Sequence, residues 1–351
     1  MKPFNYGGLE KVIRNLDTSK ISDILNHLNE ISEDGNLYSE NYQNTDEKYQ
    51  LPNTFKLSWK YDCRVVDSWG SGLNRDEAAF KAFTELLERI YFYWGTEGLY
   101  KSQGLFSKEY SLTELTEKYE GAKNFISPST SGMAIHTNKS KAKENALTEL
   151  IERHTVLKAL VKKVNPQKLE QPNFLSEYKL PTGLNISLYR WLGPFNTSVV
   201  LCEVQKGNHR VYGLGSSPNL EEATKKAFLE VTGNIIYLIH FKEIKEELTP
   251  KDKKYNFKYH LLGIGQEFSR LLGASTSSTN PIDPQINKKD IYYTQITPPE
   301  FLQSKADLYC FRAICPLMQG LFTGDWQMDK LNPLAIHISP SELPHFPHMI
   351  G

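Results

Sequence analysis

The hexapeptide Thr84-Glu-Leu-Leu-Glu-Arg89 recurs as Thr148-Glu-Leu-Ile-Glu-Arg153, 64 residues further along the chain. Alanines at the same spacing precede both copies, and a weaker third copy runs from Ala223 to Glu230. Alanine, leucine and glutamate favour helices, so each copy predicts a helical segment. A sequence motif that recurs at this long spacing indicates a duplicated supersecondary unit.

The two strong copies each place a pair of carboxylates on one helix face. Glu85 and Glu88 are three residues apart, and so are Glu149 and Glu152. Side chains at this spacing are neighbours on a helix surface. If the two helices lie side by side, four carboxylates converge on one point. Their mutual repulsion then requires cations, which are metal ions, lysines or arginines.

A simpler interpretation places the same residues on an exposed helix surface. Glu85 with Arg89, and Glu149 with Arg153, form i,i+4 pairs that stabilise a solvated helix by about 0.2–0.5 kcal/mol each. A single pair of this kind carries no functional meaning. Two nearly identical copies, each behind a glycine-bearing segment, favour a shared site.

The composition excludes several classes of protein. The chain has 351 residues, of which 39% are hydrophobic and 23% charged, enough for one large core or two. Its 41 basic and 41 acidic residues balance, so we expect no nucleic acid and no membrane as a partner. We find no segment that resembles a signal peptide and no apolar run long enough to span a membrane. The four cysteines lack C-x-x-C and zinc spacing, which favours reduced thiols in a cytoplasmic protein.

Three parts of the chain differ in character. Residues 1–54 predict an N-terminal helical segment followed by a polar surface loop over 32–54. Residues 55–330 predict the main domain, and residues 331–351 a proline-containing C-terminal tail. Within the main domain, strand patterns alternate with helices predicted from about Asp76, from 140 to 162 and from 220 to 241. This order predicts an α+β fold of three strand–turn–helix repeats packed around a central cleft.

Glycines precede each predicted helix. They lie at Gly70-Ser-Gly72, at Ser131-Gly132 and at Gly213-Leu-Gly215. We interpret these segments as turns that lead into helix N-termini. The free backbone N–H groups at such an N-terminus can receive a phosphate, although short glycine turns alone are weak signals.

With this repeat, the chain resembles the YcaO family, whose members use ATP and magnesium to activate the backbone amide of a peptide. The strongest match is the block from Ser131 to Arg153. The segments Gly70–Arg89 and Tyr212–Glu230 resemble the family's upstream and third blocks, and Arg312–Pro316 is similar to a segment near its end. The resemblance spans most of the chain and implies the YcaO-type fold.

The resemblance implies a metal cluster and a nucleotide site. Magnesium would be held by the four carboxylates of the repeat, which are Glu85, Glu88, Glu149 and Glu152. The cofactor-binding positions implied for ATP are Ser71, Lys81, Arg89, Lys141, Asn145, Arg153, Lys226 and Glu230.

Three lysines depart from the family's nucleotide motifs. Lys81, Lys141 and Lys226 stand where the family has serine, an acid and arginine, and Ala134 and Asn145 also differ from the pattern. An ammonium group can stand in a metal's place, so the lysines could neutralise the carboxylates without metal. They could also hold a phosphate directly. We favour phosphate contact for Lys226 and cluster neutralisation for Lys141.

The resemblance further implies an enzyme that modifies a peptide. A cysteine, serine or threonine side chain of the substrate would attack the preceding amide, ATP would phosphorylate the oxyanion, and phosphate would leave to give a thiazoline or oxazoline. A partner protein would deliver the precursor peptide, and a homodimer is left open. Two alternatives remain: a non-catalytic YcaO-like scaffold or peptide-binding subunit, and a thioamide-forming enzyme that uses external sulfide.

The C-terminal tail resembles the proline-rich ending of azoline-forming members, which reaches the active site. Pro347 and His348 are therefore candidate catalytic residues, although the prolines are three residues apart instead of two. The other interpretation is a frayed terminus. His136 and His154 flank the second repeat, and for His154 we expect a hydrogen-bonded structural role more than that of a general base.

Overall fold

The computed structural model describes residues 18–32, 38–42, 50–95, 102–104, 109–110, 130–239, 272, 280–296, 298–299, 302, 308–320, 328 and 331–344. The α-helices in these ranges are α1 (Thr18–Glu30), α2 (Arg75–Trp94), α4 (Lys139–Val161) and α5 (Leu220–Ile239). The strands are β1 (Tyr38–Tyr42), β2 (Asn53–Tyr61), β3 (Arg64–Gly72), β4 (Ser102–Gly104), β5 (Glu109–Tyr110), β6 (Met133–His136), β7 (Gln167–Leu169), β8 (Asn185–Leu192), β9 (Ser198–Lys206), β10 (His209–Ser217), β11 (Tyr292–Ile296) and β12 (Tyr309–Ile314). The 3-10 helices are η3 (Asn173–Glu177), η4 (Pro194–Asn196), η6 (Lys288–Asp290) and η9 (Pro340–Glu342).

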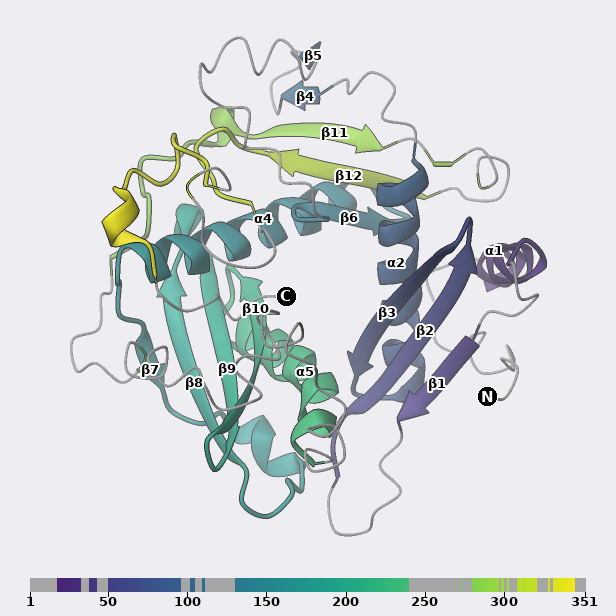
Figure 1. Ribbon diagram of the computed structural model, residues 1–351, viewed down its shortest axis with the longest axis horizontal. Helices are drawn as coiled ribbons and strands as arrows, with labels where there is room; N and C mark the ends of the chain where they lie inside the picture. Colours follow the sequence, from purple (N-terminus) through teal and green to yellow (C-terminus); the bar gives the residue numbers. More distant parts are fainter. Residues whose placement is uncertain are drawn as a thin grey trace.

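The strands form antiparallel sheets in the orders β1-β2-β3, β10-β9-β8-β7 and β5-β4-β11-β12-β6. Helix α2 packs on β2 and β3, α4 on β6 and β12, and α5 on β9 and β10. Figure 1 shows the sheets arranged around the middle of the molecule. The predicted α+β class is confirmed. Within the described ranges, every helix is too short or too polar to serve as a membrane span.

An asparagine caps each of the three helices that carry the repeat. The side chain of Asn74 accepts a hydrogen bond from the backbone N–H of Glu77 (2.9 Å). Asn138 does the same for two N–H groups of α4, and Asn219 for the N–H of Glu222 (3.2 Å). Asparagine is a preferred N-cap because its oxygen satisfies a backbone donor that the helix leaves free. These caps fix the helix starts close to the predicted positions.

The first and third units correspond residue by residue. Strand β2 begins at Asn53 and β9 at Ser198, 145 residues later, and the bounds of β3 and β10, and of α2 and α5, differ by the same number. The sequence similarity is strongest between the first and second units. The hairpin-and-helix geometry, in contrast, is shared by the first and third units, because β6 is a short strand whose partner among the described strands is β12, far away in the chain.

The glycines ahead of α2 and α5 lie inside strands, so the interpretation of these segments as turns was wrong there. A Cβ built on Gly70 in β3 would lie 2.1 Å from the carbonyl oxygen of Ala78, and one on Gly215 in β10 would lie 2.3 Å from that of Ala223. Glycine therefore lets the helix backbone approach the strand, and the repeated alanines form the facing side of that contact. Gly132 has φ +71° and precedes strand β6 instead of a helix.

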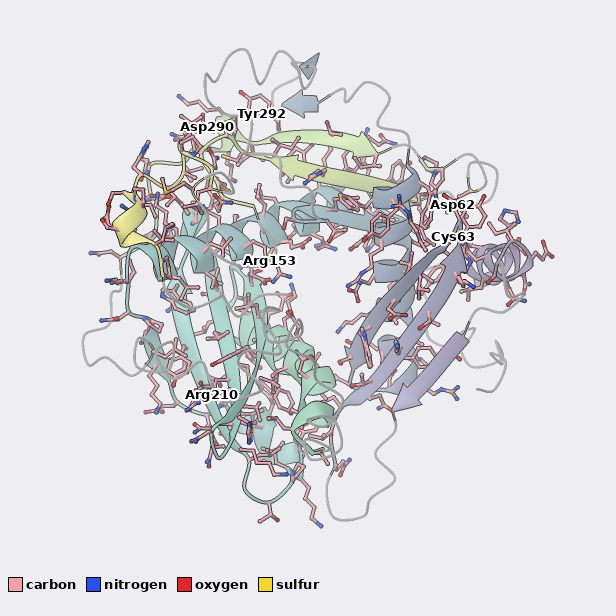
Figure 2. The ribbon with its side chains drawn as sticks, in the orientation of Figure 1. Asp62, Cys63, Arg153, Arg210, Asp290 and Tyr292 are labelled. Atoms are coloured by element: carbon pink, nitrogen blue, oxygen red, sulfur yellow. The ribbon has the colours of Figure 1, made fainter. Side chains whose placement is uncertain are left out.

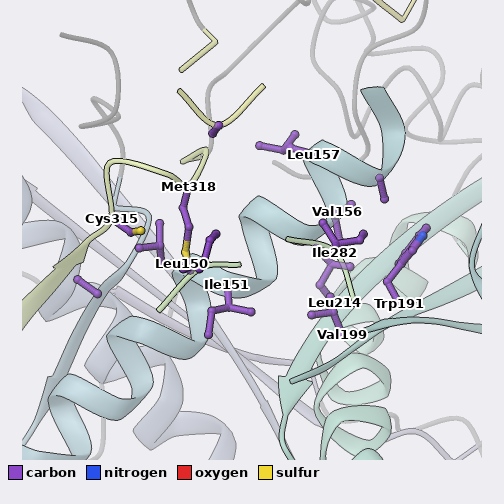
Figure 3. Close-up of a cluster of buried hydrophobic side chains, with 14 of the residues drawn as sticks. Leu150, Ile151, Val156, Leu157, Trp191, Val199, Leu214, Ile282, Cys315 and Met318 are labelled. Atoms are coloured by element: carbon purple, nitrogen blue, oxygen red, sulfur yellow. The ribbon is translucent and has the colours of Figure 1, made fainter. Parts of the chain in front are cut away.

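Three apolar clusters surround the repeat helices. One joins α4 to the inner faces of the β8–β10 sheet and β12, with Ile151, Trp191 and Leu214 among its buried members (Figure 3). A second packs α1 and α2 on β2 and β3, and a third packs α5 on the other face of β8–β10. Leu331 and Ile336 of the C-terminal segment lie in the first cluster, so residues 331–344 are anchored beside α4.

The structure corrects the polar-loop prediction for 32–54. Strand β1 lies inside that segment and pairs with β2 along its length. Its sequence, Tyr-Ser-Glu-Asn-Tyr, carries little apolar alternation, because backbone pairing with a neighbouring strand does not depend on it. Strand β11 was also not predicted. Helix α1 falls within the predicted helical segment, whereas residues 1–17 lie outside the described part of the chain.

Candidate functional site

The three repeat helices pack in a cycle. Helix α2 lies against β6 of the second unit, α4 against β10 of the third unit, and α5 against β3 of the first. Two side-chain contacts mark the cycle. Glu88 on α2 accepts a hydrogen bond from the N–H of Ile135 on β6 (3.0 Å), and Ser216 on β10 donates its hydroxyl proton to Glu152 on α4 (2.8 Å). The second glutamate of the repeat on α2 and on α4 thus contacts the neighbouring unit.

The first glutamate of the repeat binds the edge of its own sheet. Glu85 accepts a hydrogen bond from the N–H of Trp69 on β3 (2.8 Å), and Glu230 accepts one from the N–H of Leu214 on β10 (3.3 Å). Among the described strands, β3 and β10 both lie at the edge of a sheet, so their outward N–H groups face no strand of the described part of the chain. The local sequence does not point to these backbone donors, although the 145-residue spacing of the two pairs would have linked them.

Arg153 stands at the centre of the carboxylates. Its guanidinium lies 3.6 Å from Glu152 and 3.9 Å from Glu149, and burial alone would lower its pKa. The charges of Glu152, Glu230, Glu149 and Glu85 outweigh that effect and raise the pKa of Arg153. Figure 2 labels this residue on α4, near the middle of the molecule. The carboxylates of α2, α4 and α5 therefore surround one cation, and the convergence expected from the repeat is present.

The carboxylates outnumber the cations that contact them. Arg89 pairs with Glu85 at 2.5 Å, and Arg153 is the second guanidinium. We name the set the carboxylate cluster; it consists of Glu85, Glu88, Glu149, Glu152, Glu230, Arg89 and Arg153. Burial, the largest cause, raises the pKa of Glu88 and of Glu230 to about 8 and that of Glu149 well above its ordinary value. Neighbouring glutamates add to the rise in all three, so protons compensate part of the excess negative charge.

Glu230 also has solvent-accessible surface. Its raised pKa comes from desolvation of the carboxyl group and from the charges of neighbouring acids. The cluster is therefore reachable from outside, as a ligand site requires.

The cluster fits Mg²⁺ in its chemistry. Magnesium prefers carboxylate oxygens, and the excess of acids over guanidinium groups leaves negative charge for a divalent ion to balance. As they stand, no three or more His, Cys, Asp and Glu side chains of the described residues are arranged to hold a metal ion. Each acid is instead turned to an N–H, a hydroxyl or a guanidinium group. Glu85, Glu88, Glu149 and Glu152 would hold the ion after exchanging these partners and releasing protons.

The raised pKa values predict how the metal-free protein responds to pH. Glu88 has an ordinary pKa of 4.5 in the unfolded chain and about 8 in the folded one. The folded state therefore binds more protons in this window, and its stability falls as the pH rises through about 8. We expect the free energy of unfolding to drop less between about pH 6 and pH 9 in Glu88→Gln than in the wild type, because glutamine stays neutral. Equal drops in denaturant titrations of both proteins would contradict this expectation.

The three lysines do not neutralise the cluster. Lys81 pairs with Glu77 (3.0 Å) and Lys141 with Glu144 (2.7 Å), each on its own helix. Lys226 in the same way pairs with Glu222 (3.1 Å). All three are solvent-exposed by two fifths or more, and among the described residues no ion pair joins them to the clustered acids. The neutralisation role expected for Lys141 was therefore wrong, because helix geometry offers each lysine an acid one turn away.

A pocket of about 260 Å³ lies between the first turns of α4 and α5. It brings together Lys141, Asn145 and Lys226, three of the residues predicted to bind the cofactor. Glu144, and to a smaller extent Glu222 across the pocket, raise the pKa of Lys141. The remaining lining residues are Glu144, Thr148, Ser217, Pro218, Asn219 and Glu222. Ser71 and Lys81 lie instead at the first unit, where the Lys81 ammonium donates to the backbone carbonyl of Ser71 (3.0 Å).

His154 has the structural role expected for it. Its Nδ1 accepts a hydrogen bond from the N–H of Gln319 (3.0 Å), so Nε2 carries the proton and donates to Asp283 (2.9 Å). Burial lowers the pKa of His154, although Asp283 opposes this. Lys158 also binds Asp283 and donates to the carbonyl of Ala335 (2.7 Å). These contacts tie α4 to the segments that follow, away from the clustered acids.

His136, which flanks the second repeat, lies just before the start of α4. His136 accepts a hydrogen bond from the N–H of Asn138 (2.8 Å) at the start of α4, which is a local turn contact. Pro347 and His348, the candidate catalytic residues of the tail, lie outside the described residues.

A family model described as the YcaO cyclodehydratase, with binding of ATP and Mg²⁺, matches residues 109–319, more than half of the chain. The chain belongs to the YcaO family. The predicted family is thereby confirmed, and ATP and Mg²⁺, the predicted cofactors, are the ligands in the family's description. No curated protein sequence matches the chain.

Solved structures of YcaO-type proteins share the fold. The YcaO protein of Methanopyrus kandleri, bound with AMPPCP and Mg²⁺, is 15% identical with a TM-score of 0.53, over 84% of this chain and 89% of that one. The E. coli microcin synthetase McbBCD complex is 14% identical with a TM-score of 0.55, over 81% and 88%. A heterocyclase in complex with substrate and cofactor is 11% identical with a TM-score of 0.61, over 94% of this chain and 57% of that one.

Proposed function

We propose that this YcaO protein uses ATP and Mg²⁺ to activate a backbone amide of a peptide and so forms a thiazoline or oxazoline. The observation that carries the proposal is the carboxylate cluster, in which acids from three helices surround Arg153. Two of these helices, α4 and α5, also line a pocket with two lysines. A metal-bound polyphosphate is positive at the ion and negative at its oxygens. The acids suit the ion, and the arginine and lysines suit the phosphate oxygens.

The chemistry divides between the ligands and the protein. ATP supplies the phosphoryl group that turns the amide oxygen into a leaving group, and Mg²⁺ neutralises charge on the phosphates. Glu85, Glu88, Glu149 and Glu152 would hold the metal. Arg89 and Arg153 would orient these acids or bind phosphate oxygens, while Lys141, Asn145 and Lys226 would bind the nucleotide from the pocket. The nucleophile is the side chain of a cysteine, serine or threonine of the peptide.

The proposal includes a partner. A YcaO relative of this fold is part of the microcin synthetase McbBCD complex, and we infer that a separate protein delivers the precursor peptide here as well. We place the activity in the cytoplasm, on the basis of the cysteine pattern. A non-catalytic scaffold is the second candidate, and it is favoured by the acids being satisfied by N–H, hydroxyl and guanidinium groups without metal.

Calorimetry with ATP and Mg²⁺ tests the proposal. We expect the wild type to bind and its melting temperature to rise by mass action. Glu149→Gln should weaken binding about 100-fold or more, because truncating one partner of a buried charge pair at a binding site costs about 2–5 kcal/mol. The same change at exposed Glu170 is the matched control and should leave binding intact. Failure of the wild type to bind millimolar nucleotide would favour the scaffold.

A further inference from the structure

Two lysines of α4 lie over aromatic rings of the adjacent sheet. Nζ of Lys143 is 4.9 Å from the ring centre of Phe311 on β12 and 5.3 Å from that of Tyr293 on β11. Nζ of Lys139 is 5.8 Å from the same Phe311 ring. Both rings are buried, and an ammonium group is attracted to a ring face. The rings therefore hold two positive charges close together, and we name Lys139 and Lys143 the lysine pair.

The lysine pair has no acid to balance it within the described part of the chain. Lys141, which stands between the two in the sequence, pairs with Glu144, whereas neither Lys139 nor Lys143 forms an ion pair with a described residue. Burial, and then the charge of Lys139, lower the pKa of Lys143. Like charges four residues apart destabilise a helix. An anionic group bound to both ammonium groups would remove this repulsion.

The first turn of α4 differs in the same sense from those of the other two repeat helices. Helices α2 and α5 each have two acids in the first turn, Asp76 and Glu77 or Glu221 and Glu222, and α4 has none. Acids stabilise the positive end of a helix, and lysines do not. The lysine pair thus lowers the stability of α4 where its two counterparts are stabilised, which is the pattern of a binding surface.

The lysine pair and the nucleotide pocket lie on opposite sides of α4. Lys141 and Asn145 line the pocket. Successive residues of a helix are rotated by about 100°, so the lysine pair points away from them, toward β11 and β12. A helix with its side chains is about 10–12 Å wide. An extended chain covers about 3.3 Å per residue, so roughly four to six residues connect the two places.

We propose that Lys139 and Lys143 bind the carboxylate of an aspartate or glutamate in the precursor peptide, roughly four to six residues from the residue that is modified. The inference rests on the proposed function, since it takes the substrate to be a peptide. The carboxylate accepts hydrogen bonds from both ammonium groups and supplies the acid that the first turn of α4 lacks. Two side chains suit one residue of a peptide better than a folded partner, whose stable interface covers about 800 Å².

Synthetic peptides test this substrate class. Each carries one cysteine and a single glutamate, placed from about three to seven residues away on either side, and the reference peptide has glutamine in its place. Fluorescence anisotropy with the full chain measures binding. We expect the best-placed glutamate to strengthen binding about threefold to tenfold, as for two partly exposed charge pairs. Equal binding of all glutamate peptides and the glutamine peptide would overturn the inference.

Variants of the lysine pair test the residues. Lys143→Gln should reduce the preference for glutamate, and Lys139→Glu should abolish it because the new carboxylate repels the ligand. The matched control is Lys168→Gln at an exposed lysine of β7, which should keep the preference. Lys139→Glu should at the same time raise the melting temperature of the ligand-free protein, because an acid in the first turn then pairs with Lys143. A lowered melting temperature would mean that Lys139 serves the stability of α4 and would overturn its assignment to binding.

The outcomes separate this inference from the proposed function. A chain that binds ATP with Mg²⁺ but shows no preference for glutamate would overturn the peptide site and leave the proposed function standing. A chain that prefers glutamate peptides without binding ATP would overturn the proposed function and support the lysine pair on a peptide-binding scaffold. Competition between ATP and the glutamate peptide would assign the lysine pair to the nucleotide and overturn the peptide site.

Discussion

Replacing Arg153 by alanine is expected to destabilise the metal-free protein by about 3–5 kcal/mol, as for breaking a buried charge pair. The guanidinium is the cation that several acids of three helices share, and its side chain is only 16% exposed. Without it, the acids can remain buried only by taking up protons, so the loss should grow as the pH rises. Denaturant titrations at two pH values measure this effect.

Mg²⁺ provides the second half of the Arg153 experiment. If the clustered acids hold the ion, added Mg²⁺ should restore part of the stability of Arg153→Ala, because a divalent cation replaces the missing charge. Arg89→Ala is the control. Arg89 forms a partly exposed i,i+4 pair with Glu85, and pairs of this type stabilise a helix by only about 0.2–0.5 kcal/mol. An Arg153→Ala protein as stable as Arg89→Ala would contradict the central position of Arg153.

Gly70→Ala and Gly215→Ala are each expected to destabilise the protein by about 3 kcal/mol or more, at the upper end of overpacking effects. The added methyl group would lie 2.1 Å from a carbonyl oxygen of α2, or 2.3 Å from one of α5, so a helix backbone must move away from its strand. Because the two sites are equivalent in the repeat, the two losses should be of similar size.

Gly183→Ala is the matched control for these glycines. Nothing among the described residues lies within 4 Å of a Cβ at that position, and its φ of +84° alone disfavours alanine. Its loss should be on the order of 1 kcal/mol, the usual value for a residue in an unfavourable backbone region. Melting curves of the three variants give the comparison. Equal losses at all three glycines would mean that backbone conformation, and not helix–strand contact, sets their effect.

Sequence alone was sufficient for features that depend on neighbouring residues. The alanine, leucine and glutamate periodicity placed the repeat helices within a few residues of α2, α4 and α5, since helix formation and asparagine capping are local. The spacing of Glu85 with Glu88, and of Glu149 with Glu152, placed each pair on one face. The lysine partners were also local: Glu77 and Glu222 stand one turn before Lys81 and Lys226 and were overlooked.

The tertiary structure decided every feature that depends on which repeat units pack against each other. The cyclic packing of helices on the next unit's strand brings Glu230 close to Arg153. The strand glycines serve helix–strand contact instead of forming turns. The tertiary structure also shows that the first and third units share the same hairpin-and-helix geometry, although the first unit is more similar in sequence to the second. Backbone geometry tolerates many side chains, whereas charge clustering and close approach require a specific neighbour far away in the chain. For that reason the acids were predictable one helix at a time, and their meeting around Arg153 only from the assembled structure.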